Sequence, residues 1–185
     1  AAMVPAMIQV MLLEPQCPET DFSSLAYILY GGSPIAESLL RKAMKTFSCD
    51  FVQIYGLTET GNCAICLSEA AHTSSNTNLL KSAGQPFPGV SVAIVDSAGK
   101  KLPPSQIGEI WLKSPAKMLG YWKLPEATAK TLVDGWIHTG DAGYCDNEGY
   151  IYICDRLKDM ICYAGENVYP AEIENILYEH PAIQE

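Results

Sequence analysis

The chain has 185 residues, of which 48% are hydrophobic and 18% charged, and this composition excludes a disordered, collagen-like or simple coiled-coil protein. Its net charge of −9, without any basic block, argues against nucleic-acid binding. No apolar run approaches the ~20 residues of a membrane-spanning helix, and the seven scattered cysteines favour a reduced, cytoplasmic setting over a disulfide framework.

The first third of the chain predicts a parallel α/β unit. Apolar residues recur at helical spacing over residues 3–13, which predicts an amphipathic helix. Residues 25–30 and 51–54 are short apolar runs typical of buried strands. Ser33 and Pro34 suit the cap and first position of a helix between them. That helix would bury one stripe of side chains: Leu39, Leu40, Ala43, Met44 and Phe47. A strand, helix and strand in this order imply parallel strands.

The rest of the chain changes character. Residues 68–82 are polar and predict a surface loop. From residue 84 onward, tight turns separate short strands, which predicts an antiparallel sheet or a small barrel. The charged residues 155–159 then form the best candidate for a hinge. Strands are expected at residues 90–95, 107–113, 150–154 and 160–163, and a helix is expected to begin at Pro170.

Two glycine-containing segments follow the predicted parallel strands. Tyr30-Gly31-Gly32-Ser33 would let a flat or anionic ligand approach the backbone, although the segment by itself favours an ordinary tight turn. In residues 55–61, Tyr55 offers an aromatic face for a base and Thr58 a hydroxyl for phosphate. Glu59 offers oxygen ligands of the kind that Mg²⁺ prefers.

Two further segments carry charged groups. Asp141 follows a glycine in what reads as a compact turn, where a carboxylate can accept both hydroxyls of a ribose. His138 has no accompanying nucleophile pattern, so we expect it to pack against the core or its rim. The charged run Asp155-Arg156-Leu157-Lys158-Asp159 would by itself be a solvated face.

Together these segments resemble a known family. The matching motifs are Tyr-Gly-Leu-Thr-Glu-Thr at 55–60, Thr-Gly-Asp at 139–141, Asp-Arg-Leu-Lys-Asp at 155–159 and Gly-Glu-Asn-Val-Tyr-Pro-Ala-Glu-Ile-Glu at 165–174. Their order and wording resemble the AMP-forming adenylating enzymes: acyl-CoA synthetases, coumarate-CoA ligases, firefly-type luciferases and peptide-synthetase adenylation domains. The resemblance covers essentially the whole chain.

The resemblance implies a fold and a reaction. Residues 1–83 would end the α/β subdomain of a large AMP-binding domain, residues 84–154 would form a β-barrel-like subdomain, and residues 155–185 would be the hinge and the start of an α+β lid. The family's phosphate loop would precede residue 1 and its late lysine would follow residue 185, so this excerpt would not complete the reaction. The enzyme would activate a carboxylic acid with ATP and Mg²⁺ to an acyl-adenylate, and then form a thioester with CoA.

The same resemblance assigns site residues by motif. The adenine site would be lined by Gly31, Gly32, Ser33 and Tyr55, and Gly56 would also contact the nucleotide. Thr58 would touch phosphate, Glu59 would bind Mg²⁺, and Asp141 and Arg156 would hold the ribose. Lys158 would be the hinge, and Gly165 would lie near the path of the thiol.

The substrate and the thiol acceptor are less defined. Tyr169-Pro170-Ala171-Glu172 resembles acyl-CoA synthetases, which favours a fatty or other hydrophobic acid. Two alternatives stay open: an adenylation module that loads a carrier protein, and a non-catalytic nucleotide-binding protein. The sequence does not indicate an oligomeric state.

Overall fold

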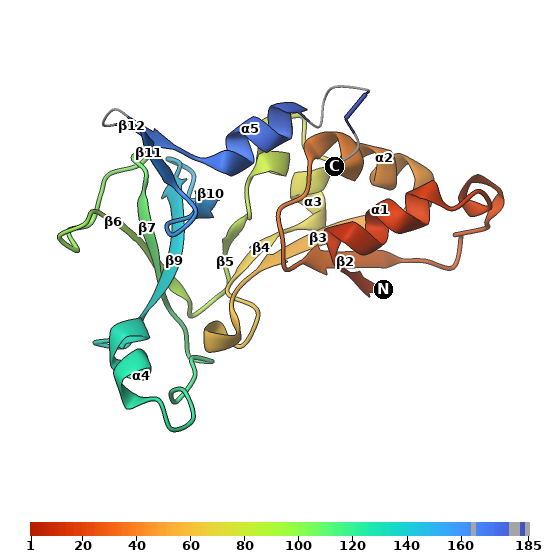
Figure 1. Cartoon of the computed structure of the whole chain (residues 1–185). Coiled ribbons are helices and arrows are strands. Elements are labelled where there is room, and N and C mark those ends of the chain that lie inside the picture. Colours follow the sequence, from red (N-terminus) through yellow and green to blue (C-terminus); the bar gives the residue numbers. More distant parts are fainter. Residues whose placement is uncertain (164–165, 178–181, 184–185) are drawn as a thin grey trace.

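The computed structural model describes residues 1–163, 166–177 and 182–183, which form two main β-sheets with helices beside them (Figure 1). The first sheet has the strand order β1-β2-β3-β4-β5. Its strands and the helical segments between them are β1 (Ala2–Met3), α1 (Pro5–Leu13), η1 (Cys17–Glu19), β2 (Tyr27–Gly31), α2 (Glu37–Phe47), β3 (Asp50–Tyr55), η2 (Thr58–Thr60), β4 (Ile65–Leu67), α3 (Glu69–His72), η3 (Thr77–Lys81) and β5 (Gln85–Pro86).

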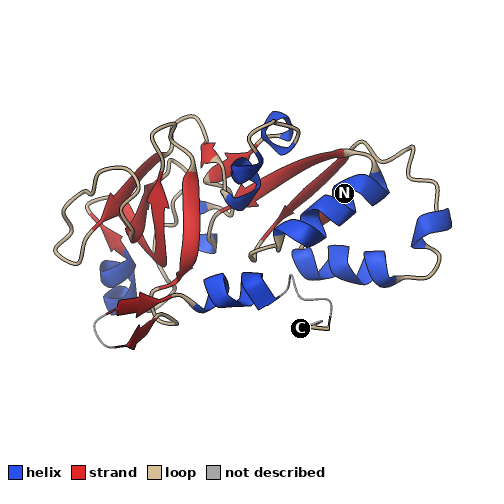
Figure 2. Ribbon diagram, turned by 90° about the horizontal axis from the view of Figure 1, so that it is seen from above, coloured by secondary structure: helices blue, strands red, loops and turns tan. Residues whose placement is uncertain are grey.

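The predicted βαβ unit is confirmed. Strands β1, β2 and β3 are parallel neighbours, and Gly31 at the end of β2 lies opposite Ile54. Helices α1 and α2 lie on one side of this sheet (Figure 2). The predicted stripe of α2 turns toward the core, where Leu40, Ala43 and Phe47 are buried. The carboxyl ends of β2 and β3 therefore meet at one edge.

The starts of both predicted helices need correction. Residues 2 and 3 form strand β1, so the first helix begins at Pro5, and Met7 within it is about half exposed. Helix α2 begins at Glu37 after Ala36 rather than at Pro34, and no side chain caps it. Strand β2 ends at Gly31, and Gly32 after it has a φ of +88°, so the chain changes direction before the helix begins.

The predicted surface loop at residues 68–82 is wrong. The Ser68 side chain accepts a hydrogen bond from the Ala71 amide and so caps α3, and η3 follows at Thr77–Lys81. His72 is buried with its Nε2 2.9 Å from the Tyr30 hydroxyl oxygen. The segment looks polar in sequence because its few apolar side chains are spread over two short helical turns.

The second sheet is antiparallel, as predicted, with the order β10-β9-β7-β6 and β8 paired to β9. Helix α4 and strands β8 and β9 were not predicted. The elements of this half are β6 (Ser91–Val95), β7 (Gly108–Lys113), α4 (Pro125–Thr131), β8 (Leu132–Val133), β9 (Trp136–Cys145) and β10 (Ile151–Arg156).

The two sheets share a core. Ala64 and Ile65 beside the first sheet pack in one buried cluster with Ile110 and Ile151 of the second. A bridge between Gly84 and Ile151 joins the two sheets directly. This contact brings the carboxyl end of β3 close to strands β9 and β10.

Beyond the second sheet, a turn at residues 157–159 leads to the hairpin β11 (Ile161–Tyr163) with β12 (Glu166–Val168) and to α5 (Pro170–Leu177). The predicted strand at 160–163 and the helix from Pro170 are thus confirmed. The whole is a mixed α/β fold with an antiparallel sheet, as expected. Among the described residues no helix is long and apolar enough to cross a bilayer.

Candidate active site

Two glycine loops lie at the shared edge of β2 and β3. A Cβ on Gly31 would lie 2.2 Å from the Ile54 carbonyl oxygen, so close packing of the two strands requires glycine there. Gly32 has more room, because the nearest atom to its Cβ would be Val4 Cγ1 at 3.6 Å, but its positive φ favours glycine. Ser33 is exposed beside it. The loop is open to a ligand, although strand packing alone explains why residue 31 is glycine.

Tyr55, Asp141 and Arg156 come together at this edge. The Tyr55 hydroxyl donates to Asp141 Oδ2 at 2.5 Å, and Arg156 Nε lies 2.9 Å from Asp141 Oδ1. The three residues come from β3, β9 and β10, and the first two are 86 positions apart in sequence. The structure therefore joins three of the residues that the sequence motifs assigned to one nucleotide site.

The predicted turn around Asp141 is wrong. Asp141 lies inside the long strand β9, directly opposite Arg156 of β10. Gly140 before it has a φ of +71°, and the pairing of β7 with β9 shifts register at this point. The glycines in this segment resemble turn signals, but here they allow a bulge that aims Asp141 toward Tyr55.

Thr139, two residues before Asp141, fixes the backbone of Asp141 by a hydrogen bond. Its buried hydroxyl donates to the Ile110 carbonyl oxygen at 2.6 Å and accepts from the Asp141 amide at 3.0 Å. Thr139 belongs to the Thr-Gly-Asp motif, but nothing in the motif alone indicates this role.

Glu109 holds the bulge from the neighbouring strand. One of its carboxylate oxygens accepts from the Gly140 amide at 3.1 Å and the other from Trp111 Nε1 at 2.8 Å. His138 stacks on Trp111 with ring centroids 3.9 Å apart, so it packs as predicted. Nothing in the local sequence distinguishes Glu109 from other strand residues, and sequence analysis missed it.

Burial controls the electrostatics of the cluster. Desolvation raises the pKa of Asp141, and the hydrogen bond from Tyr55 and the charge of Arg156 oppose that shift. Nearby Glu109 and Asp155 add to the increase. Burial, followed by the neighbouring Asp141, also raises the pKa of Tyr55, which therefore stays a hydrogen-bond donor.

Thr58 and Glu59 lie in η2, just after β3. Thr58 is exposed, and Glu59 is half-buried with Oε1 bonded to the Tyr121 hydroxyl. No group of three or more acidic, histidine or cysteine side chains suited to a metal occurs in the part of the chain that the structure describes. Glu59 could thus be one ligand of a Mg²⁺ ion whose remaining ligands are phosphate oxygens and water, which is how Mg²⁺ commonly binds with nucleotides.

Gly56 and Lys158, two further assigned residues, lie in other surroundings. A Cβ on Gly56 would lie 2.6 Å from the Asn62 carbonyl carbon, so this glycine also has a packing reason. Lys158 is exposed in the turn that follows β10, where a hinge can stay solvated. Gly165 lies outside the described residues.

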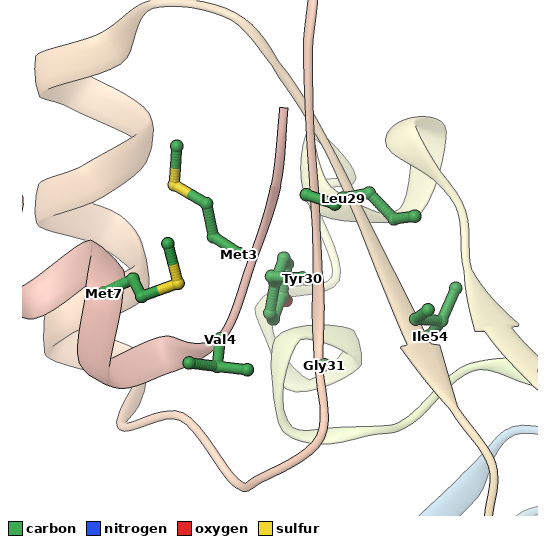
Figure 3. Close-up of a pocket in the computed structure, with 8 residues that line it drawn as sticks. Met3, Val4, Met7, Leu29, Tyr30, Gly31 and Ile54 are labelled. Carbon is green, nitrogen blue, oxygen red and sulfur yellow. The ribbon is translucent and has the colours of Figure 1, made fainter. Parts of the chain in front are cut away.

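An apolar cavity of about 300 Å³ lies beside the Gly31 loop. Figure 3 shows Met3, Val4 and Met7 on one side of β2 and Ile54 on the other. The lining offers aliphatic and thioether groups at the edge where the polar cluster also lies. An apolar group fits here better than a charged one.

Comparison with known proteins agrees with this geometry. A sequence model of the family described as AMP-binding enzyme matches residues 1–122. The fatty acid–[acyl-carrier-protein] ligase ScoC of Streptomyces coeruleorubidus is 55% identical over 185 residues, which are 100% of this chain and 36% of that protein. A feruloyl-CoA synthase of an Amycolatopsis species is 41% identical over 181 residues, 98% of this chain and 36% of that protein.

Solved structures show the same fold. The O-succinylbenzoate coenzyme A synthetase MenE of Bacillus subtilis, in complex with ATP and a magnesium ion, superposes with a TM-score of 0.83 at 36% identity, over 100% of this chain and 37% of that one. The chain thus spans about a third of the length of the proteins it matches. By its sequence and its fold, this chain belongs to the AMP-binding enzyme family.

Proposed function

We propose that this chain is part of an enzyme that uses ATP to activate a hydrophobic carboxylic acid, and then transfers the acyl group to the thiol of CoA. In the first step a carboxylate oxygen of the acid attacks the α-phosphorus of ATP. The bond from that phosphorus to the bridging oxygen breaks, and pyrophosphate leaves with the electron pair. In the second step the thiolate sulfur attacks the acyl carbon, the bond from that carbon to the phosphate oxygen breaks, and AMP leaves with the electron pair.

One observation carries the proposal: three distant motifs meet in the Tyr55–Asp141–Arg156 cluster. A buried carboxylate between a phenol and a guanidinium is suited to accept ribose hydroxyls, and Arg156 adds a donor close by. The Gly32–Ser33 loop lies at the end of the strand beside Tyr55 and leaves room for adenine.

The same edge supplies the groups for phosphate. Thr58 can donate to a phosphate oxygen and Glu59 can bind Mg²⁺, whose charge neutralises the phosphates during transfer. The chain's residues orient the nucleotide in this mechanism, and none acts as a covalent nucleophile.

The acid class follows from the apolar cavity. Its lining of Met3, Met7 and Leu29 accepts a hydrocarbon chain or an aromatic ring, and it lies beside the nucleotide loop. The names of two relatives, a fatty-acid ligase and a feruloyl-CoA synthase, support a hydrophobic acid.

We also propose the division of labour along the chain. Residues 1–83 and 84–154 would form the nucleotide-binding part, although β5 at 85–86 pairs with the first sheet, and residues 155–185 would begin a lid that moves about Lys158. Because the matched relatives are about three times longer, the 185 residues would work as part of a longer enzyme. Its setting would be the cytoplasm, with ATP and CoA as co-substrates.

A carrier-protein thiol is the second candidate acceptor. The relative with 55% identity is named as a fatty acid–[acyl-carrier-protein] ligase, and the other two are named for CoA. Both acceptors present a phosphopantetheine-type thiol to an acyl-adenylate, so the first half-reaction is the same.

The full-length protein tests both steps. Acid-dependent exchange of labelled pyrophosphate into ATP, over a panel of fatty and aromatic acids, should be strongest with hydrophobic acids. Supplied acyl-AMP should then give a thioester with CoA faster than with a carrier protein. Exchange that no acid stimulates would refute the activity, and a preference for the carrier protein would select the second acceptor. The 185-residue chain alone should release no pyrophosphate.

A further inference from the structure

Glu59 is held by a segment far away in the sequence. The Tyr121 hydroxyl donates to Glu59 Oε1 although the two residues are 62 positions apart. The Met118 amide also donates to the Glu59 carbonyl oxygen at 2.8 Å. The loop before α4 therefore contacts both the backbone and the side chain of the residue that we assign to magnesium.

The position of Tyr121 does not depend on its hydroxyl. Its amide donates to Thr128 Oγ1 at 2.9 Å, and Thr128 Oγ1 in turn donates to the Leu124 carbonyl oxygen at 2.9 Å. These bonds tie the tyrosine backbone to α4. Gly120 before it has a φ of +150°, and a Cβ there would lie 2.8 Å from Thr128 Cγ2, so the loop also packs closely on α4.

The carboxylate of Glu59 is thus fixed on one side only. The Glu59 side chain has several rotatable bonds, and the short segment η2 does not fix them. The hydrogen bond from the Tyr121 hydroxyl restricts their rotation. The described residues give Glu59 Oε2 no hydrogen bond. Oε1 keeps one lone-pair site beside the Tyr121 bond, and Oε2 offers both of its sites to a cation.

We propose that Tyr121 is a positioning residue for magnesium-dependent nucleotide binding: its hydroxyl donates to Glu59 Oε1 and so restricts the carboxylate that would bind the cation of Mg–ATP. This rests on the proposed function, because it takes Glu59 as a magnesium ligand. Partners that hydrogen-bond a metal-binding carboxylate from behind commonly change metal affinity by about 10- to 100-fold when they are removed.

The matched variant is Tyr121→Phe in the full-length protein. It removes one hydroxyl and leaves the ring, the Thr128 bond and the Met118 bond in place. Calorimetric titration with ATP at a series of Mg²⁺ concentrations gives the Mg²⁺ dependence of nucleotide affinity. We expect the Mg²⁺ concentration for half-maximal tightening to rise by about tenfold, with affinity for ATP in chelator unchanged.

Two controls separate the possible failures. Tyr27→Phe removes a hydroxyl from a half-exposed tyrosine and should leave the Mg²⁺ dependence as in the parent protein. Glu59→Gln should raise the Mg²⁺ concentration for half-maximal tightening of ATP binding more than Tyr121→Phe does. If Glu59→Gln raises this concentration and Tyr121→Phe does not, the positioning role is refuted while the proposed function stands.

Two other outcomes also count against the inference. If neither variant changes the Mg²⁺ dependence, the magnesium assignment of Glu59 fails together with it. If Tyr121→Phe lowers the thermal midpoint and weakens ATP binding equally with and without Mg²⁺, the tyrosine is structural and the proposal is wrong.

Discussion

Asp141→Asn should weaken nucleotide binding without weakening the fold. Asp141 is only 3% exposed, and burial raises its pKa despite the Tyr55 and Arg156 contacts. The ionised carboxylate is therefore less stable in the folded protein than in water. A residue kept at a cost to stability is expected where a ligand needs its charge.

The sign of the pH effect follows from linkage. The pKa of Asp141 rises above its ordinary value of 3.8 on folding, so the folded state holds the proton to a higher pH than the unfolded state does. The stability that Asp141 contributes is present below the unfolded pKa and is lost as the pH rises through the folded pKa. Relative to Asp141→Asn, the parent protein should lose stability over that window and stay level above it.

The neighbours tolerate the amide. The Arg156 side chain is 49% exposed and stays hydrated without its partner. The Tyr55 hydroxyl can donate to the asparagine side-chain oxygen in place of the carboxylate. We therefore expect Asp141→Asn at neutral pH to be at least as stable toward urea as the parent protein.

Binding should change in the opposite direction. A carboxylate has about four lone-pair sites, and Tyr55 and Arg156 use one on each oxygen, which leaves one on each for the ribose hydroxyls. A hydrogen bond to a charged group contributes roughly 1.5–3 kcal/mol. The loss of one such bond weakens ATP binding by about 10- to 150-fold.

Calorimetry with ATP and urea unfolding across the acid-to-neutral range measure the two effects in the full-length protein. Asp134→Asn is the matched control, because it removes the same charge from an exposed turn. Unchanged ATP affinity in Asp141→Asn would refute the ribose assignment. Strong destabilisation at neutral pH would instead show that the carboxylate is chiefly structural.

Two further predictions concern the backbone. Gly31→Ala places a Cβ 2.2 Å from the Ile54 carbonyl oxygen and should destabilise the protein by about 1–3 kcal/mol in urea unfolding; Gly32→Ala should have a smaller effect, and equal losses would refute the packing argument. Lys158→Pro in the full-length protein should leave acyl-AMP formation within about tenfold, or ~1.4 kcal/mol, of normal and reduce thioester formation from supplied acyl-AMP far more; Lys158→Ala should spare both, and equal losses in Lys158→Pro would exclude a hinge.

Local patterns predicted the parallel unit well. The stripe of α2 and the apolar runs of β2 and β3 follow directly from residue spacing, because each element buries one face against its neighbours. The helix starts were less accurate, since Ser33 and Pro34 carry start signals that the geometry after Gly32 overrides. Gly140, just before Asp141, looked like part of a compact turn, and this reading concealed the long strand β9.

Some residues of the candidate site could be identified from the sequence and others could not. Tyr55, Asp141 and Arg156 stand in recognisable motifs, so the resemblance identified them before the structure joined them. Glu109 and Tyr121 reach the site only through strand register and loop packing, 31 and 62 positions from their partners. Such contacts leave no local periodicity, and only a three-dimensional arrangement reveals them.

The position of the proposed hinge follows from where sheet pairing ends. Arg156 is the last residue of β10 and pairs with Asp141, and the Leu157 amide still donates to the Gly140 carbonyl oxygen at 2.8 Å. In the turn that follows, the amides of residues 159 and 160 both donate to the Arg156 carbonyl oxygen. A backbone hydrogen bond of this kind contributes about 0.5–1.5 kcal/mol, so the backbone bonds at this turn oppose a rotation about Lys158 only weakly, and the main contacts to be broken are those of α5 with β10. Arg156 would then stay on the ribose with Asp141 while the following hairpin moves, which lets one nucleotide grip serve both half-reactions.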